Sequence, residues 1–130
     1  MHDYTLPFDK ETIEKIKETH PTPFYLYDEE GIKNCVKKIQ NAFSWNKGYK
    51  EYFAVKATPN PAILRLLSSL GCGFDCASSA ELTMAQKLGV VGQNIMFSSN
   101  DTPAGDYRFA RELGAIVNLD DCSHIDFLSE

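Results

Sequence analysis

The sequence has no excess of basic residues, no long hydrophobic run and few histidines. Its 13 Lys and Arg residues against 18 Asp and Glu residues give a net charge of -5. A nucleic-acid-binding face needs clustered basic residues that release counterions, and a membrane span needs roughly 20 apolar residues. We therefore expect neither a nucleic-acid partner nor a membrane partner. The start, Met1-His2-Asp3, lacks the basic and apolar stretches of a signal peptide, which predicts a cytoplasmic protein.

The cysteines and histidines show no spacing typical of metal ligands. Cys72 and Cys76 stand four residues apart, which is not a common zinc spacing, and no histidine lies near them in the sequence. The sequence predicts no metal site, and we expect all four cysteines to be free, buried thiols. It also contains no P-loop, no G-x-S-x-G elbow and no H-E-x-x-H motif.

The 130 residues have the composition of an ordinary soluble domain, with 43% hydrophobic, 12% aromatic and 24% charged residues. A chain of this length is expected to form one domain with a real core. Near the N-terminus the pattern predicts a helix over 9–19, a short aromatic strand over 24–27, and a helix that Asp28 caps.

From residue 52 onward, short apolar segments alternate with amphipathic ones at a period of about 20 residues, which is typical of parallel β-α-β units. The predicted strands are 52–55, 73–77, 95–98 and 115–119. The predicted helices are 61–70, 80–88, 103–113, which Thr102 caps, and a last one from 123. Two architectures fit this alternation. The length favours a complete doubly wound sheet, whereas the chemistry at the strand ends favours part of a (β/α)8 barrel of about 250 residues.

Each predicted strand ends in polar groups, where parallel α/β folds form their sites. These groups are Lys56, Asp75 with Ser78 and Ser79, Ser98 with Asn100, and Asn118 with Asp120. Strand alternation places Lys56 with Ala54, and Asp75 with Ala77. We therefore expect Lys56 and Asp75 to face one interior, where the two small alanines leave space for a flat ligand.

Each of these residues also has a purely structural interpretation. Lys56 fits a solvated residue at a strand end, and Asp75 fits a turn carboxylate. Ser78 and Glu81 have the spacing of a capping box, and Asn100 is typical of a loop. The functional interpretation is a partly desolvated lysine that forms a Schiff base with a carbonyl compound, oriented or deprotonated by the aspartate.

Three blocks of the sequence carry a resemblance to a known family. They are Thr22-Pro23-Phe24-Tyr25-Leu26-Tyr27-Asp28, then Tyr52-Phe53-Ala54-Val55-Lys56-Ala57, then Gly73-Phe74-Asp75-Cys76-Ala77-Ser78-Ser79-Ala80-Glu81-Leu82. In order and spacing they resemble the start of the pyridoxal-phosphate-dependent decarboxylases of the alanine-racemase-like barrel type. The resemblance implies an α/β fold that comprises about the first half of a (β/α)8 TIM barrel.

The resemblance also implies the site residues and the reaction. Lys56 would bind pyridoxal 5'-phosphate covalently, Asp75 would lie beside it as a second catalytic residue, Glu81 would belong to the active-site region, and Ala54 and Ala77 would line the cofactor ring. The family removes the α-carboxylate of an amino acid as CO2. Diaminopimelate, which would yield lysine, is the leading substrate. Ornithine, arginine and carboxynorspermidine decarboxylases remain open.

The sequence departs from the family mainly in length. It lacks the cofactor-stacking histidine, the glycine-rich phosphate loop, the acid that pairs with the pyridine nitrogen and the C-terminal β domain. We therefore expect an N-terminal fragment of a homodimeric enzyme. Residues 1–30 would pack with the β domain, and residues 31–130 would form half of the barrel. Alone, this fragment is expected to be inactive and to bind the cofactor weakly or not at all.

Two alternatives to a decarboxylase remain at this point. A racemase with the same lysine would change the handedness of an amino acid without releasing CO2. A non-catalytic α/β module would only bind a partner. In its receiver-like form, such a module would need an acidic cluster after the first strand, where this sequence has Lys56.

Overall fold

The computed structural model describes residues 6–100 and 102–129. The chain divides into two compact units, one ending at Cys35 and the other beginning at Val36. None of the helices among the described residues is long and apolar enough to cross a membrane.

The first unit contains helix α1 (Lys10–Thr19), which confirms the helix predicted over 9–19. Asp9 caps it, with its side chain accepting a 2.7 Å hydrogen bond from the backbone N–H of Thr12. The predicted strand over 24–27 is wrong, because these residues form no regular secondary structure. A strand needs a neighbouring strand for its hydrogen bonds, and the described part of the chain supplies none here. Helix α2 (Glu29–Ala42) then begins directly after Asp28.

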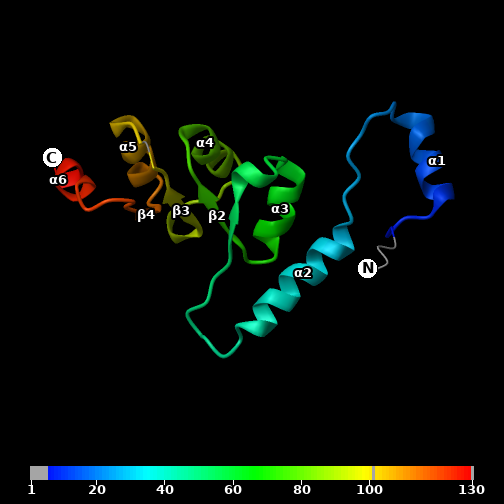
Figure 1. The fold of residues 1–130 in the computed structure, drawn as a ribbon, viewed down its shortest axis with the longest axis horizontal. Coiled ribbons are helices and arrows are strands. Elements are labelled where there is room, and N and C mark those ends of the chain that lie inside the picture. The colour runs from blue at the N-terminus through cyan, green and yellow to red at the C-terminus, as the bar shows by residue number, and fades with distance from the viewer. Residues whose placement is uncertain (1–5, 101, 130) are drawn as a thin grey trace. The chain divides into compact units, whose positions relative to one another are not determined.

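The second unit alternates strands and helices as predicted (Figure 1). All four strands are parallel, and they lie in the sheet in the order β1-β2-β3-β4. The elements are β1 (Tyr52–Ala54), the 3-10 helix η1 (Val55–Ala57), α3 (Pro61–Ser69), β2 (Gly73–Cys76), α4 (Ser79–Lys87), the 3-10 helix η2 (Gly92–Asn94), β3 (Ile95–Ser98), α5 (Ala104–Glu112), β4 (Ile116–Asn118) and α6 (His124–Ser129). The strand predicted over 115–119 is therefore shorter than expected at both ends.

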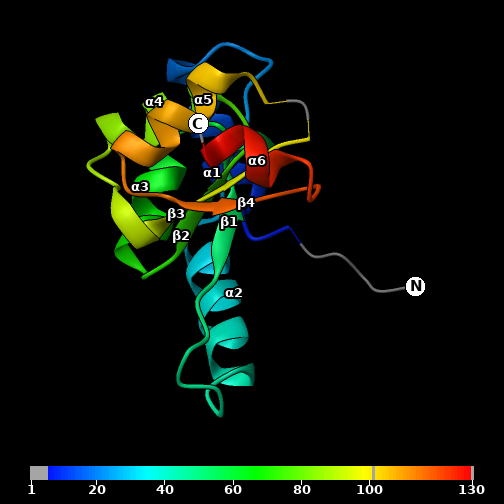
Figure 2. The ribbon, with the colours of Figure 1, turned by 90° about the vertical axis from the view of Figure 1, so that its left-hand side faces the viewer.

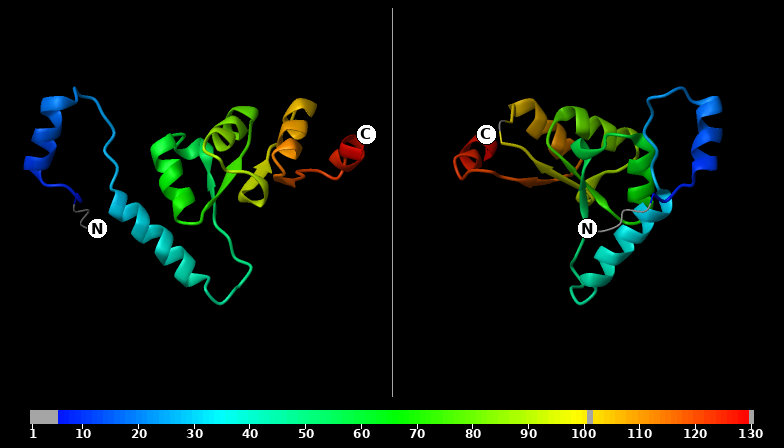
Figure 3. Two further views of the ribbon diagram at one scale, coloured as in Figure 1. Left: turned by 180° about the vertical axis from the view of Figure 1, so that it is seen from behind. Right: turned by 45° about the vertical axis from the view of Figure 1, so that its right-hand side comes forward.

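One face of the sheet carries the core. Phe74, Cys76, Ile95 and Phe97 alternate along β2 and β3 and are fully buried. They pack with buried side chains of α3, α4 and α5, among them Leu64, Leu82, Ala85, Tyr107 and Ala110. Figure 2 shows α3 and α4 on one side of the strands, and Figure 3, seen from behind, shows α3, α4 and α5 following one another along the sheet.

The opposite face of the sheet carries Ala54, Asp75, Met96 and Ile116, which are paired in register across the four strands. None of these four side chains is buried. A doubly wound sheet has helices on both faces, whereas a (β/α)8 barrel has them outside only. A sheet with successive helices on one face and no buried side chain among these four residues on the other therefore corresponds to part of a barrel wall.

Gly73 lets the aromatic ring of Tyr52 lie across the start of β2. A Cβ atom at Gly73 would stand 2.6 Å from the Tyr52 ring and 2.9 Å from the carbonyl oxygen of Asn94. The Tyr52 hydroxyl donates a 2.7 Å hydrogen bond to the carbonyl oxygen of Gln93. The missing side chain thus allows β1 to be tied to η2 at the end of the sheet opposite the candidate site.

Two details of the sequence-based predictions need correction. Helix α5 begins at Ala104, with Pro103 rather than Thr102 at the cap position. The Thr102 hydroxyl donates instead to the carbonyl oxygen of Ser99, at 3.2 Å, and so does not cap the helix. All four cysteines are free, as predicted, but only two are buried, Cys72 and Cys76, whereas Cys35 and Cys122 are exposed.

Candidate functional site

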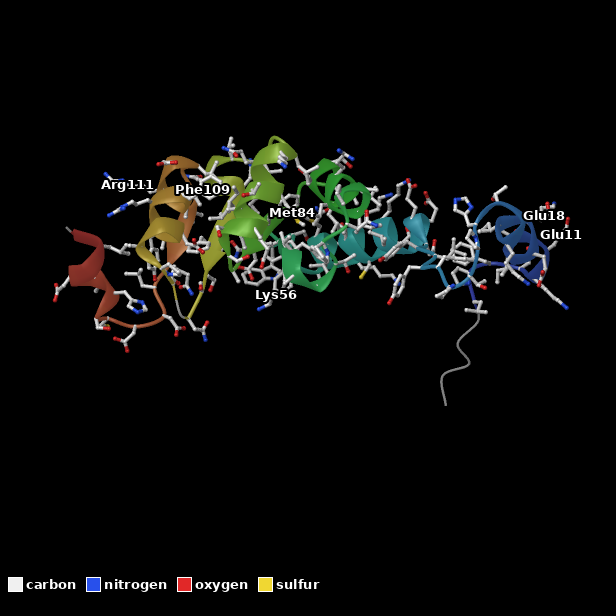
Figure 4. The ribbon with its side chains drawn as sticks, turned by 90° about the horizontal axis from the view of Figure 1, so that it is seen from above. Glu11, Glu18, Lys56, Met84, Phe109 and Arg111 are labelled. Atoms are coloured by element: carbon white, nitrogen blue, oxygen red, sulfur yellow. The ribbon has the colours of Figure 1, made fainter. Side chains whose placement is uncertain are left out.

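Lys56 leaves the sheet at the carboxyl end of β1. Alternation along a longer strand predicted that it shares a face with Ala54, but the strand ends at Ala54 and the chain turns into η1. Val55 in this turn is fully buried, and Lys56 is exposed. Because η1 packs against β2, the turn still places Lys56 next to the strand that carries Asp75. In Figure 4 Lys56 projects from the turn on the side away from Met84 of α4 and Phe109 of α5.

Asp75 lies beside Ala54 in the register of β1 and β2. Its Oδ1 atom is buried and has no hydrogen-bond partner among the described residues. Burial raises the pKa of the Asp75 carboxyl; the positive charge of Lys56 opposes this rise, and the negative charge of Glu81 adds to it. The structure therefore brings Lys56 and Glu81 within electrostatic reach of Asp75, and it leaves one Asp75 carboxylate oxygen available to a hydrogen-bond donor.

Glu81 and Ser78 form the capping box that their spacing predicts. The Ser78 side chain accepts from the Glu81 backbone N–H at 3.4 Å, and the Ser78 hydroxyl donates to Glu81 Oε1 at 3.1 Å. Glu81 Oε2 accepts a 3.0 Å hydrogen bond from the Ala77 backbone N–H, one residue before the usual position. Both Glu81 oxygens thus accept hydrogen bonds from the turn after β2. Glu81 therefore affects Asp75 through its negative charge rather than through a hydrogen bond.

The ends of β3 and β4 contribute a second polar pair. Ser98 and Asn118 are partners in the strand register, and the Asn118 Nδ2 group donates a 3.1 Å hydrogen bond to Ser98 Oγ. The sequence places each residue at a strand end but does not indicate this pairing. Asn100 and Asp120, named with them, are exposed.

One residue at this end of the sheet was missed by sequence reasoning. Asp106, in the first turn of α5, accepts a 3.1 Å hydrogen bond from the backbone N–H of Ser79 on α4. An acid in a first helical turn usually serves its own helix, so its position along the chain does not indicate this contact.

A large hollow in the described structure lies elsewhere, within the first unit. It has a volume of about 760 Å³ and is lined mainly by apolar side chains, among them Phe8, Ile13, Phe24 and Leu26. It contains no lysine and only one carboxylate, that of Asp28. The chemistry that the strand ends present is absent from it, so we place the candidate site at Lys56 and Asp75.

Known proteins resemble the chain over most of its length. Residues 29–130 match the family described as pyridoxal-dependent decarboxylase, pyridoxal binding domain. Protein TabA of Pseudomonas amygdali pv. tabaci is 42% identical over 114 residues, which are 88% of this chain and 27% of that protein. Diaminopimelate decarboxylase of Helicobacter pylori strain J99 is 38% identical over 103 residues, which are 79% of this chain and 25% of that protein.

Solved structures show the same fold. The crystal structure of lysine decarboxylase from Selenomonas ruminantium superposes with a TM-score of 0.84 at 24% identity, covering 97% of this chain and 32% of that one. Diaminopimelate decarboxylase from Helicobacter pylori, complexed with L-lysine, gives 0.77 at 35% identity, covering 88% of this chain and 29% of that one. The chain spans about a quarter of the length of the curated relatives it matches, and its sheet is part of a barrel rather than a doubly wound fold.

The residues at the strand ends fit pyridoxal phosphate. An exposed lysine amine suits the aldehyde of this cofactor, and the unpartnered Asp75 oxygen suits a polar donor beside it. The small side chains of Ala54 and Ala77 leave room for a ring. With the family match over residues 29–130, these features show that the chain belongs to the pyridoxal-dependent decarboxylase family and carries part of its pyridoxal-binding domain.

Proposed function

We propose that this chain supplies the lysine-bearing half of the barrel of an amino-acid decarboxylase. The observation that carries the proposal is the exposed amine of Lys56 next to the buried, unpartnered oxygen of Asp75, at the carboxyl ends of adjacent parallel strands. Ligand sites of barrels form at this end.

Each residue of the proposed site has a separate role. When bound, pyridoxal phosphate supplies an aldehyde and a conjugated ring that accepts the electron pair released as CO2 departs. Lys56 would hold the aldehyde of the cofactor through its side-chain amine. Asp75 would stabilise positive charge at the lysine nitrogen and orient the amine of the substrate. Ala54 and Ala77 would line the ring, and the negative charge of Glu81 lies close enough to the Asp75 carboxyl to raise its pKa.

The leading substrate in this proposal is meso-diaminopimelate, with lysine and CO2 as products. Several diaminopimelate decarboxylases support it, at 29–42% identity. Ornithine decarboxylase of Nicotiana glauca, at 30% identity, keeps ornithine as an alternative. Arginine and carboxynorspermidine belong to the same test, because all these compounds are amino acids that carry a second polar end.

The surroundings of this enzyme are also part of the proposal. We propose that residues 1–30 pack with a C-terminal β domain, that the enzyme is a homodimer, and that it works in the cytoplasm. The segment 24–27, which lacks a strand partner in the described chain, supports the first point, with Tyr25 90% exposed. The four free cysteines fit a reducing compartment.

The test uses the complete polypeptide that contains residues 1–130, with residues 1–130 alone as the comparison. Titration with pyridoxal phosphate is followed by absorbance, and CO2 release is measured with meso-diaminopimelate, ornithine, arginine, lysine and carboxynorspermidine. We expect stoichiometric cofactor binding and CO2 release by the complete polypeptide only. Cofactor binding with a change of handedness and no CO2 would indicate a racemase, and no cofactor binding would refute the proposal.

Replacing Asp75 with asparagine is expected to make stability less dependent on pH. Burial raises the pKa of Asp75, so the folded state holds this proton more tightly than the unfolded chain does. The contribution of Asp75 to the free energy of unfolding is therefore fully present below the unfolded-state pKa of about 3.9. It is lost as the pH rises through the pKa of the folded state. Asparagine does not ionise and avoids the loss. Urea midpoints should show Asp75→Asn becoming more stable relative to the wild type as the pH rises above about 4.

The same variant is expected to lose decarboxylase activity, because Asp75 lies within electrostatic reach of Lys56. Glu112→Gln, which removes an exposed carboxylate from α5, controls for the change in net charge. If Asp75→Asn followed the wild type at every pH, the buried oxygen would not carry the shifted proton.

A further inference from the structure

Three consecutive residues of the turn between β2 and α4 donate hydrogen bonds to carboxylates. The Ala77 backbone N–H and the Ser78 hydroxyl both donate to Glu81, at 3.0 Å and 3.1 Å. The Ser79 backbone N–H donates to Asp106 Oδ2 at 3.1 Å. Glu81 belongs to α4 itself, whereas Asp106 comes from α5. Asp106 is thus the group in this set that joins the turn to the next helix of the barrel wall.

Asp106 serves the neighbouring helix instead of its own. It is the third residue of α5, where an acid ordinarily supports the helix N-terminus. In α5 the cap position is Pro103, which makes no side-chain cap hydrogen bond. The half-buried Asp106 carboxylate instead accepts from Ser79, the first residue of α4. One of the otherwise unpaired N–H groups at the start of α4 is therefore satisfied from outside the helix.

The turn that Asp106 holds continues directly from the site. Asp75 lies in β2, two residues before Ala77, and β2 packs against η1, which carries Lys56. The position of the Asp75 carboxylate relative to Lys56 therefore depends on where this turn sits. A displacement at one place in such a site is costly, since catalytic groups need their geometry within about half an ångström.

We propose that Asp106 is a positioning residue of the active site. Through Ser79 it fixes the turn 77–79, and thereby the end of β2 and Asp75, against the helical layer. Asp106 does not touch the cofactor or the substrate. This role rests on the proposed decarboxylase function for its kinetic consequence, but the contact itself is independent of any ligand.

The experiment compares Asp106→Ala and Asp106→Asn with a matched control in the complete polypeptide. Glu112→Ala removes a carboxylate from the same helix, where it is exposed and away from the turn. Three quantities are measured: hydrogen exchange of the 77–79 amides without cofactor, the Kd for pyridoxal phosphate, and kcat and KM for decarboxylation. Thermal melts establish that each variant is folded at the temperature used.

For Asp106→Ala we expect faster exchange at Ser79, a Kd for the cofactor raised about 3- to 10-fold, and a fall in kcat of about 10-fold with little change in KM, as follows when transition-state geometry is lost. Asp106→Asn keeps an oxygen that can accept from the Ser79 N–H. It should therefore recover most of the cofactor affinity and most of the kcat that Asp106→Ala loses. Glu112→Ala should match the wild type. If Asp106→Ala does not fold, the intermediate loss in Asp106→Asn carries the test.

Two outcomes would overturn the proposal. One is unchanged exchange at Ser79 in Asp106→Ala. The other is faster exchange together with wild-type cofactor affinity and kcat, which would leave Asp106 a purely structural contact. If the wild type itself bound no cofactor, the proposed function would fail, and unchanged or accelerated exchange would still decide whether Asp106 holds the turn.

Discussion

Lys56→Ala in the complete polypeptide is expected to lose the covalent link to pyridoxal phosphate and nearly all decarboxylase activity. Lys56 is exposed at the carboxyl end of β1, and within the described residues its amine makes no hydrogen bond or ion pair. The variant loses both the nucleophile and a group that moves protons, and loss of proton transfer alone costs about 10²- to 10⁴-fold in rate.

Two further lysine variants separate charge from chemistry. Lys56→Arg keeps a positive charge beside Asp75 but is expected to form no link, because the guanidinium stays protonated. Lys87→Ala removes an exposed lysine at the end of α4 and should behave as the wild type.

Reduction with borohydride followed by peptide mass mapping measures the link directly. We expect the pyridoxyl group on the peptide that contains Lys56, and on no peptide of Lys56→Ala or Lys56→Arg. A pyridoxyl group on another lysine, with activity retained in Lys56→Ala, would move the site away from the strand ends.

Phe97→Ala is expected to produce the largest loss of stability. Phe97 is fully buried in β3. Its ring meets that of Tyr107 on α5 edge to face, with 5.9 Å between the centroids. Removing a buried phenylalanine costs about 3–5 kcal/mol, a large share of the about 5–15 kcal/mol that holds a domain together. The loss reflects both the lost transfer free energy and the cavity left between the sheet and α5.

Urea denaturation followed by circular dichroism checks this expectation. Trp45→Ala removes a larger aromatic side chain that is 77% exposed, and it should change the free energy of unfolding by less than about 0.5 kcal/mol. Phe97→Leu keeps an apolar side chain, is expected to lose less than Phe97→Ala, and serves if the alanine variant does not fold. Equal midpoints for Phe97→Ala and Trp45→Ala would show that this face of the sheet is not the core.

The order of elements in the second unit follows from the sequence alone, because its signals are local. Pro61 opens α3, and Ser78 with Glu81 opens α4, through contacts between residues near in sequence. The burial of alternate residues in β2 and β3 follows from their hydrophobic pattern. The same locality explains why the hydrophobic pattern suffices to identify Lys56 and Asp75 as residues at strand ends.

Only the tertiary structure decided how distant residues meet. The turn at Val55 moved Lys56 out of the strand alternation, because the packing of η1 on β2 outweighs the local strand pattern. The segment 24–27 has the composition of a strand but forms none, because a strand needs a neighbouring strand to share its hydrogen bonds. The Asp106–Ser79 contact joins residues 27 positions apart. Such a pairing depends on the packing of α4 against α5, which the hydrophobic pattern of the sequence does not predict.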